Sequence, residues 1–138
     1  MYSVTLAIDN VLTPQTISLQ AELTARELVE AAFVQLQTDK NPDPFKFTID
    51  YFGYDHFQGV TSYLGYFIVS IDSYVTNANN YWDLYVNGTA SLVGMDSYLV
   101  QPNDKIELKW ITIAANAPSV AHQVQRVQAR RSSTVTKA

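Results

Sequence analysis

The sequence contains no cysteine among its 138 residues. This absence excludes a disulfide framework, a thiol nucleophile and a thiolate metal site. Charged residues are scarce at 16%, below the roughly 25% of an average domain. Long apolar runs are also missing, since no window approaches the ~20 apolar residues of a membrane-spanning helix. With 47% hydrophobic residues, the composition predicts one ordinary folded domain with a sizeable core.

Signatures of catalysis and of metal binding are missing too. The two histidines, His56 and His122, have no second ligand at metal spacing. Asp50, Asp55 and Asp72 follow no calcium-loop pattern. The sequence has neither a G-x-S-x-G nucleophile motif nor a phosphate-binding loop. We therefore expect no catalytic residue, no metal site and no enzymatic activity.

The few charges are unevenly placed. Residues 116–138 hold four of the nine Lys and Arg and no acidic residue, although the formal net charge of the chain is -4. A basic segment can bind an anionic partner, but four charges are few for that role. We expect a folded domain over residues 1–115, a flexible tail over 116–138, and no nucleic-acid partner. Residues 1–9 lack the basic start and apolar run of a signal peptide, so the residues alone predict none.

Hydrophobic alternation predicts a chain made mostly of strands. Between them we expect a polar and aromatic connection over residues 53–65 and an Asn-rich loop over 74–80. The strands are expected at residues 3–9, 16–20, 45–52, 65–72, 81–86 and 105–111.

One helix is predicted after the first two strands. Thr24 and Glu27 have the spacing of a capping box, and Leu23 and Leu28 that of a hydrophobic staple. Apolar residues then recur at helical spacing up to Leu36. The helix should span about residues 25–38, because two prolines follow within residues 41–44.

This order of elements predicts an α+β fold. The expected topology is a ubiquitin-like β-grasp, with one helix packed on a mixed four- to five-stranded sheet. The crossover helix would let the first and last strands lie side by side in parallel. Asn87-Gly88 should form a type I′ hairpin turn, which explains these residues better than the glycosylation sequon that they also form with Thr89.

Four segments carry a resemblance to a known family. They are Leu23-Thr-Ala-Arg-Glu-Leu28, Gly65-Tyr-Phe-Ile-Val-Ser-Ile-Asp72, Tyr81-Trp-Asp-Leu-Tyr-Val-Asn-Gly88 and Tyr98-Leu-Val-Gln-Pro-Asn-Asp-Lys-Ile-Glu107. The order and the sequences of these segments resemble the domain at the C-terminal end of transcobalamin and intrinsic factor, together with its bacterial relatives of unassigned function. The resemblance covers roughly residues 2–113.

The resemblance implies a β-grasp of a kind that binds soluble ligands. In the vitamin carriers this domain packs on cobalamin from one side, while a separate helical domain covers the other. A corrinoid is therefore one candidate ligand, on the resemblance alone, and otherwise we expect no cofactor. The relatives are typically secreted or wall-associated, which leaves the compartment of this chain open.

The alternation of side chains along the predicted strands also indicates a candidate binding surface. Trp82 and Trp110 fall on the inward faces of their strands, which predicts that both belong to the core. Tyr66, Tyr81 and Tyr85 fall on the opposite faces, where three tyrosines on adjacent strands could stack a ring or a sugar. The alternative is that these tyrosines pair across strands and only stabilise the sheet.

The loop before Tyr81 completes the predicted site. Tyr74, Asn79 and Asn80 offer groups that suit hydrogen bonding to a ligand, although Asn residues are also common turn formers. The leading hypothesis is a non-catalytic binding module for a small molecule, a glycan or a protein partner. The alternative hypothesis is an assembly module that adds a partner strand at a sheet edge. The oligomeric state is left open.

Overall fold

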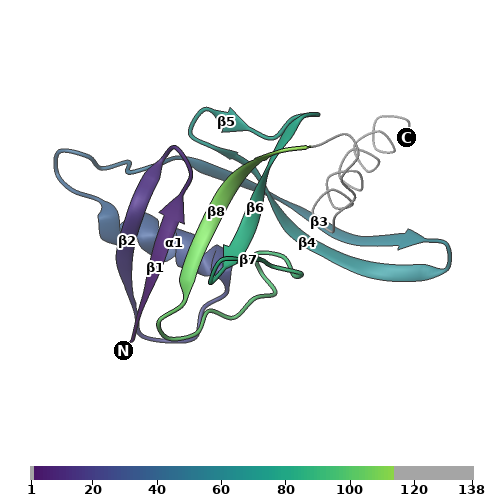
Figure 1. Ribbon diagram of the computed structural model, residues 1–138, viewed down its shortest axis with the longest axis horizontal. Helices are drawn as coiled ribbons and strands as arrows, with labels where there is room; N and C mark the ends of the chain where they lie inside the picture. Colours follow the sequence, from purple (N-terminus) through teal and green to yellow (C-terminus); the bar gives the residue numbers. More distant parts are fainter. Residues whose placement is uncertain (1, 114–138) are drawn as a thin grey trace.

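The structure is a computed structural model that describes residues 2–113, so the predicted domain limit at 115 and the predicted tail lie outside it. The described chain is α+β, with one helix, α1 (Ala25–Leu36), and strands in two sheets (Figure 1). A five-stranded sheet has the order β2-β1-β8-β6-β7, and a three-stranded sheet has the order β3-β4-β5. The strands are β1 (Tyr2–Ile8), β2 (Leu12–Leu19), β3 (Phe47–Phe57), β4 (Val60–Ile71), β5 (Tyr74–Val75), β6 (Asn80–Val86), β7 (Thr89–Ala90) and β8 (Lys105–Thr112).

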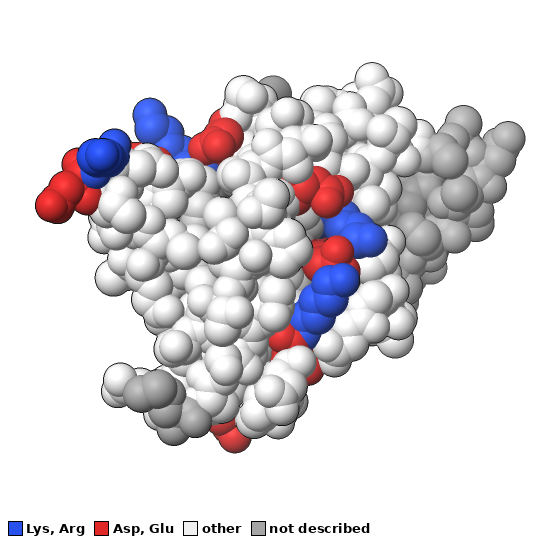
Figure 2. All heavy atoms as spheres, turned by 60° about the vertical axis from the view of Figure 1, so that its left-hand side comes forward, with Lys and Arg blue, Asp and Glu red and all other residues white. Residues whose placement is uncertain are grey.

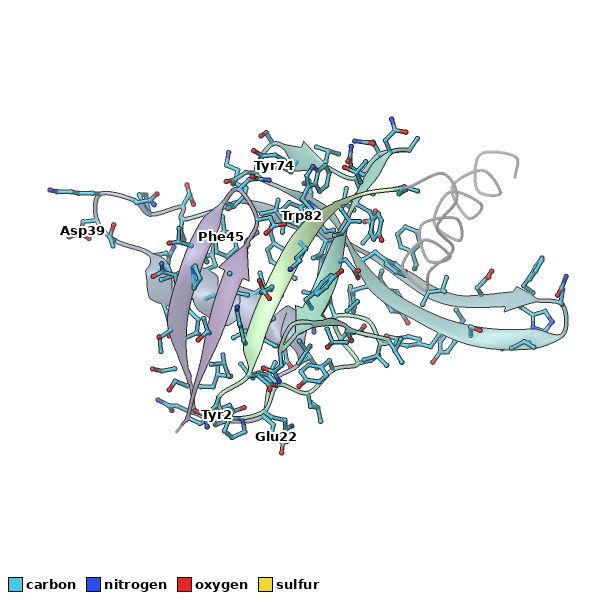
Figure 3. All side chains as sticks on the ribbon, in the orientation of Figure 1. Tyr2, Glu22, Asp39, Phe45, Tyr74 and Trp82 are labelled. Carbon is cyan, nitrogen blue, oxygen red and sulfur yellow. The ribbon has the colours of Figure 1, made fainter. Side chains whose placement is uncertain are left out.

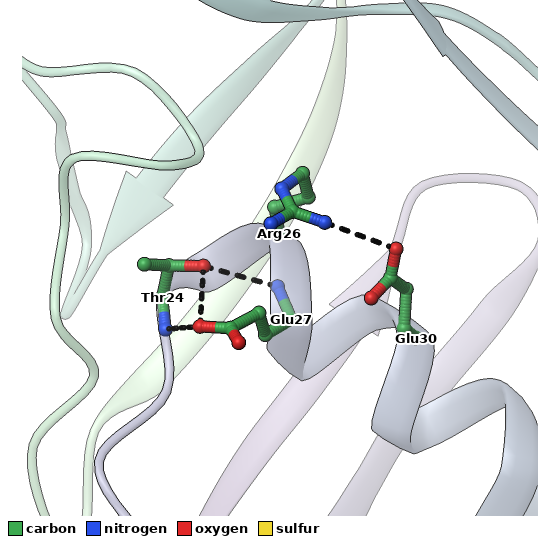
Figure 4. Close-up of polar contacts among 4 residues, drawn as sticks. All are labelled: Thr24, Arg26, Glu27 and Glu30. Carbon is green, nitrogen blue, oxygen red and sulfur yellow. Dashed lines mark hydrogen bonds and ion pairs between the residues drawn. The ribbon is translucent and has the colours of Figure 1, made fainter.

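The start of α1 confirms the predicted capping box (Figure 4). The Thr24 hydroxyl accepts from the Glu27 backbone amide at 3.2 Å, and the Glu27 carboxylate accepts from the Thr24 amide at 3.0 Å. These two bonds satisfy amides that the first helical turn leaves without partners. The hydrogen bonds from Thr24, together with the neighbouring Arg26 charge, outweigh burial and hold the pKa of Glu27 below its ordinary value.

The core lies between α1 and the five-stranded sheet. Figure 1 shows α1 crossing behind β1, β2 and β8. The apolar stripe of the helix and the inward faces of the strands supply most of the fully buried side chains, and Phe45 and Val100 from connecting segments are buried with them. The helix and strand residues of the core include Val4, Leu6, Ile8, Ile17, Leu19, Leu28, Val29, Ala32, Ile106 and Leu108.

The predicted parallel pairing of the first and last strands is confirmed. β1 and β8 run in parallel with Leu6 opposite Ile106 and Ile8 opposite Leu108. This register places four buried side chains on the helix-facing side of the sheet. Because parallel neighbours require a crossover, the helix and the second sheet lie between β1 and β8 in the sequence.

The prediction of a single sheet was wrong. Residues 53–65, predicted as a connection, form most of a long hairpin in which β3 and β4 pair from Phe47–Ile71 to Phe57–Val60. Figure 1 shows this hairpin leaving the five-stranded sheet as a separate twisted ribbon. Gln58 and Gly59 make the two-residue turn with φ values of 54° and 79°. The sequence misled because register shifts at Gly53 interrupt the alternation that marks a strand.

The two resemblance motifs at the C-terminal side meet at one buried carboxylate. Asp104 accepts hydrogen bonds from the Tyr98 hydroxyl at 2.5 Å, the Gln101 amide at 2.8 Å and the Asn87 side-chain amide at 2.9 Å. Burial alone would raise the pKa of Asp104, but these three hydrogen bonds outweigh burial and the pKa lies below its ordinary value. Asn87 and Gly88 have φ values of 52° and 87°, as a type I′ turn requires. These motifs therefore hold the β6–β7 turn against β8.

Candidate functional site

A cavity of about 320 Å³ opens where the two sheets diverge. β4 supplies one wall, β6 the opposite wall, and the segment after β7 the remainder. Five of the lining side chains are aromatic, and Asp83 is the charged residue of the lining. The lining residues are Tyr63, Leu64, Tyr66, Phe67, Ile68, Tyr81, Trp82, Asp83, Leu84, Ser91, Leu92, Val93, Gly94, Met95 and Ser97.

Both strand walls turn an edge toward this cavity. β6 pairs with β8 along its whole length, but it pairs with β7 only at Tyr85 and Val86. β4 pairs with β3 along its length, but it pairs with β5 only at Ser70 and Ile71. Residues 63–68 and 81–84 therefore lie at strand edges, where some backbone groups are already bonded: the Leu84 carbonyl accepts from the Ser91 amide, and the Ile68 carbonyl accepts from the Thr76 hydroxyl.

Asp96 fixes the mouth of the cavity on the β4 side. Its carboxylate accepts a hydrogen bond from the Tyr63 hydroxyl and a longer one, 3.4 Å, from the Tyr66 backbone amide. The hydrogen bond to Asp96 raises the pKa of Tyr63 well above its ordinary value. A Cβ at Gly65 would lie 2.4 Å from the Asp96 Oδ1 atom, so the carboxylate fits against β4 only because residue 65 is glycine.

Asp83 gives the β6 wall an unusual carboxyl group. Burial raises its pKa to about 6, although a hydrogen bond from the Leu84 amide opposes that rise. Its cross-strand neighbour Lys109 places Nζ 4.6 Å from the ring centre of Tyr85. The Asp83 carboxyl can therefore donate or accept a hydrogen bond close to neutral pH.

The structure brings only some of the predicted site residues together. Tyr66 and Tyr81 line the cavity from opposite strands, whereas Tyr85, Tyr74 and the two asparagines are not among its lining residues. The predicted platform on adjacent strands was wrong, because Tyr66 belongs to a different sheet from Tyr81 and Tyr85. Tyr81 was also predicted to face outward, yet it is only 9% exposed. Alternation assigned the correct face of β6 but could not show whether that face is covered.

The loop residues have structural contacts. Tyr74 packs edge-on against Trp82 and Trp110, with ring centroids 6.2 and 5.7 Å apart, and Figure 3 shows Tyr74 beside Trp82. The Asn77 side-chain oxygen accepts from the backbone amides of Asn79 and Asn80 at 2.7 and 3.0 Å, as in a local turn.

The two tryptophans fall where alternation predicted them. Trp82 is buried, Trp110 is partly buried against the core, and their ring centroids lie 5.0 Å apart. The Trp82 indole N–H donates to the Tyr74 carbonyl at 2.9 Å. Trp82 reaches the cavity wall from this core position.

Sequence reasoning missed a cluster of four tyrosines on the long hairpin, here called the tyrosine quartet: Tyr51, Tyr54, Tyr63 and Tyr66. The signal was present as two copies of Y-x-G-Y, at residues 51–54 and 63–66. The copies pair antiparallel, with Tyr51 opposite Tyr66, Tyr54 opposite Tyr63 and the two glycines opposite each other. Both glycines have positive φ, and the register shifts beside them. This double irregularity lets residues three apart share one face of the hairpin.

The described residues offer neither a metal-binding cluster nor a helix able to span a membrane. Between residues 2 and 113, no three His, Asp or Glu side chains lie close enough together to hold a metal ion. Within the same part of the chain, no helix has the length and apolar character to cross a membrane.

A protein family model matches part of the chain. The sequence profile described as a domain of unknown function (DUF4430) matches residues 47–112, slightly less than half of the chain. This span contains the long hairpin, every wall of the cavity and β8. A comparison with curated proteins found no match.

Two solved structures have a similar fold. The crystal structure of haptocorrin in complex with Cbi aligns with a TM-score of 0.62 and 18% identity, over 82% of this chain and 25% of haptocorrin. A candidate metal-binding protein from Ruminococcus gnavus ATCC 29149 aligns with a TM-score of 0.52 and 14% identity, over 83% of this chain and all of that one. The chain thus spans about a quarter of the haptocorrin chain. At these identities the likeness concerns the fold alone, and that fold is transcobalamin-like.

Proposed function

We propose that this chain is a non-catalytic binding module whose ligand occupies the cavity between β4 and β6. The observation that carries the proposal is the cavity itself, which combines aromatic walls, two strand edges and one carboxyl group. Mostly apolar walls with a few polar groups are typical of small-molecule sites, and the volume lies at the lower end of their usual range.

We further propose that the five-stranded sheet and α1 form a β-grasp of the transcobalamin-like kind, with the β3-β4-β5 sheet added to it. The order β2-β1-β8-β6, with a helix packed across one face and a parallel central pair, supports this assignment. Haptocorrin, which is similar in fold, was solved in complex with Cbi. A corrinoid is therefore the first ligand to test, although the chain spans only part of haptocorrin.

Filling the cavity should weaken ligand binding. We expect cobinamide, or a compound from a metabolite library, to raise the thermal unfolding midpoint, because a ligand at 100 times its Kd adds about 2.7 kcal/mol to stability. Val93 lines the cavity and is 47% exposed, so Val93→Trp should weaken that binding at least about tenfold without unfolding the chain.

The matched control is Val75→Trp, at a valine of similar exposure, 51%, that does not line the cavity. This variant should bind as the unmodified chain does. The proposal is contradicted if no compound shifts the midpoint, or if the shift survives Val93→Trp unchanged.

A further inference from the structure

The tyrosine quartet forms one continuous aromatic surface. The ring centroids of Tyr51 and Tyr66 lie 5.0 Å apart, those of Tyr54 and Tyr63 also 5.0 Å, and those of Tyr51 and Tyr63 6.4 Å. These distances fall within the range of aromatic contact, so the four rings form one connected cluster. Tyr51, Tyr54 and Tyr63 are 56%, 62% and 44% exposed.

The inner end of this surface is anchored. The Arg26 guanidinium lies 4.9 Å from the ring centre of Tyr66 and also pairs with Glu30 at 3.1 Å. Asp96 holds the Tyr63 hydroxyl. A surface that is fixed before a ligand arrives loses little conformational entropy on binding, and tyrosine itself has few rotatable bonds.

The charge of the described residues disfavours a polyanionic ligand. Residues 2–113 contain all 13 Asp and Glu but only five Lys and Arg. Figure 2 shows one face of the molecule, where most of the surface is uncharged and the charged side chains form small groups. Nucleic acids and other polyanions bind through clusters of Lys and Arg, whereas residues 2–113 carry more than twice as many acidic as basic side chains. A stacking surface of tyrosines therefore suits a neutral ligand.

We propose that the tyrosine quartet binds a neutral glycan by stacking sugar rings on Tyr51, Tyr54 and Tyr63. Tyrosine matches this ligand because its ring packs on the apolar face of a sugar while its hydroxyl bonds to sugar hydroxyls. Tyr63 and Tyr66 also line the cavity, so the quartet extends that site outward along the hairpin. The inference rests on the proposed function, since it names the ligand class for the outer part of the same site.

Affinity electrophoresis tests this inference on the full chain. Native gels would contain one soluble neutral polysaccharide each: a mixed-linkage β-glucan, a starch, a mannan or a xylan. We expect at least one to retard the chain, and the retardation to persist at high salt, because the ligand carries no charge. The double variant Tyr51→Ser/Tyr54→Ser should lower the affinity at least about tenfold.

Phe57→Ser is the matched control. Phe57 is 52% exposed on the same hairpin, but alternation places it on the face opposite Tyr54. This variant should be retarded as the unmodified chain is, and Tyr51→Phe/Tyr54→Phe should keep the part of the affinity that comes from stacking. Equal unfolding midpoints would show that each variant is folded.

Two results would overturn the inference: no retardation in any gel, or retardation that survives Tyr51→Ser/Tyr54→Ser. Failure of the proposed function can be distinguished from failure of this inference, because Tyr51 and Tyr54 do not line the cavity. If the Val93→Trp variant still binds a cavity ligand as the unmodified chain does, only the proposed cavity site is contradicted. If the Tyr51→Ser/Tyr54→Ser variant is still retarded by the polysaccharide, only the proposed glycan site on the quartet is contradicted.

Discussion

Asp104→Ala is expected to lower the free energy of unfolding by about 3 kcal/mol, because it removes the buried carboxylate that accepts three part-buried hydrogen bonds. The donors are the Tyr98 hydroxyl, the Gln101 amide and the Asn87 side chain, which join the β6–β7 turn to β8. Urea unfolding at neutral pH measures this change. A loss below about 1 kcal/mol would contradict the assigned role of Asp104.

The same variant has an expected pH dependence. The folded-state pKa of Asp104 lies below its ordinary value, so its ionised form stabilises the fold above the unfolded pKa of about 4. That stabilisation is lost as pH falls through the folded-state pKa. The stability gap between the unmodified chain and Asp104→Ala should therefore narrow on acidification. Asp39→Ala, at an exposed position, serves as the control and should change stability by less than about 0.5 kcal/mol at any of these pH values.

Gly65→Ala is expected to cost about 3 kcal/mol of stability and to release Tyr63. The alanine would have to keep the backbone φ of 65°, and its Cβ would lie 2.4 Å from the Asp96 Oδ1 atom. The left-handed backbone accounts for about 1–2 kcal/mol of that cost. The rest arises because Asp96 must leave the two hydrogen bonds that it accepts on β4. Alkaline titration of tyrosine absorbance should then show one tyrosine ionising at lower pH than before.

Gly59→Ala isolates the effect of the carboxylate. Gly59 also has a positive φ, 79°, but a Cβ there meets nothing within 4 Å. This control should cost only about 1–2 kcal/mol and should leave the tyrosine titration unchanged. Equal losses for the two variants would show that Asp96 does not fix the hairpin at Gly65.

Local signals in the sequence predicted the elements that local chemistry determines. The Thr24 capping box and the proline-containing segment after the helix placed α1 over about 25–38, and the structure ends it at Leu36. Asn87-Gly88 predicted its turn because few other residue pairs tolerate two positive φ values. The parallel placement of the first and last strands also followed, since one crossover helix allows it.

The rest depended on long-range pairing. The long hairpin escaped prediction because Gly53 and Gly65 shift the register on both of its strands, which breaks the period of two. The tyrosine quartet escaped for the same reason, although the repeated Y-x-G-Y motif marks it. The cavity was beyond prediction, since it exists only where β4 diverges from β6. The sequence predicted that Tyr66 and Tyr81 share one platform, whereas in the structure they line one cavity from separate sheets.

The most direct test of the binding-module account is a titration of the full, isotope-labelled chain followed by backbone amide NMR. The ligand is cobinamide or the library compound that first raises the unfolding midpoint. The account predicts that the amides of Leu64, Tyr66, Trp82 and Val93 shift together in proportion to occupancy, because all four residues line the cavity. The account is contradicted if the chemical shifts of these four amides do not change while those of amides on the β1–β2 hairpin do.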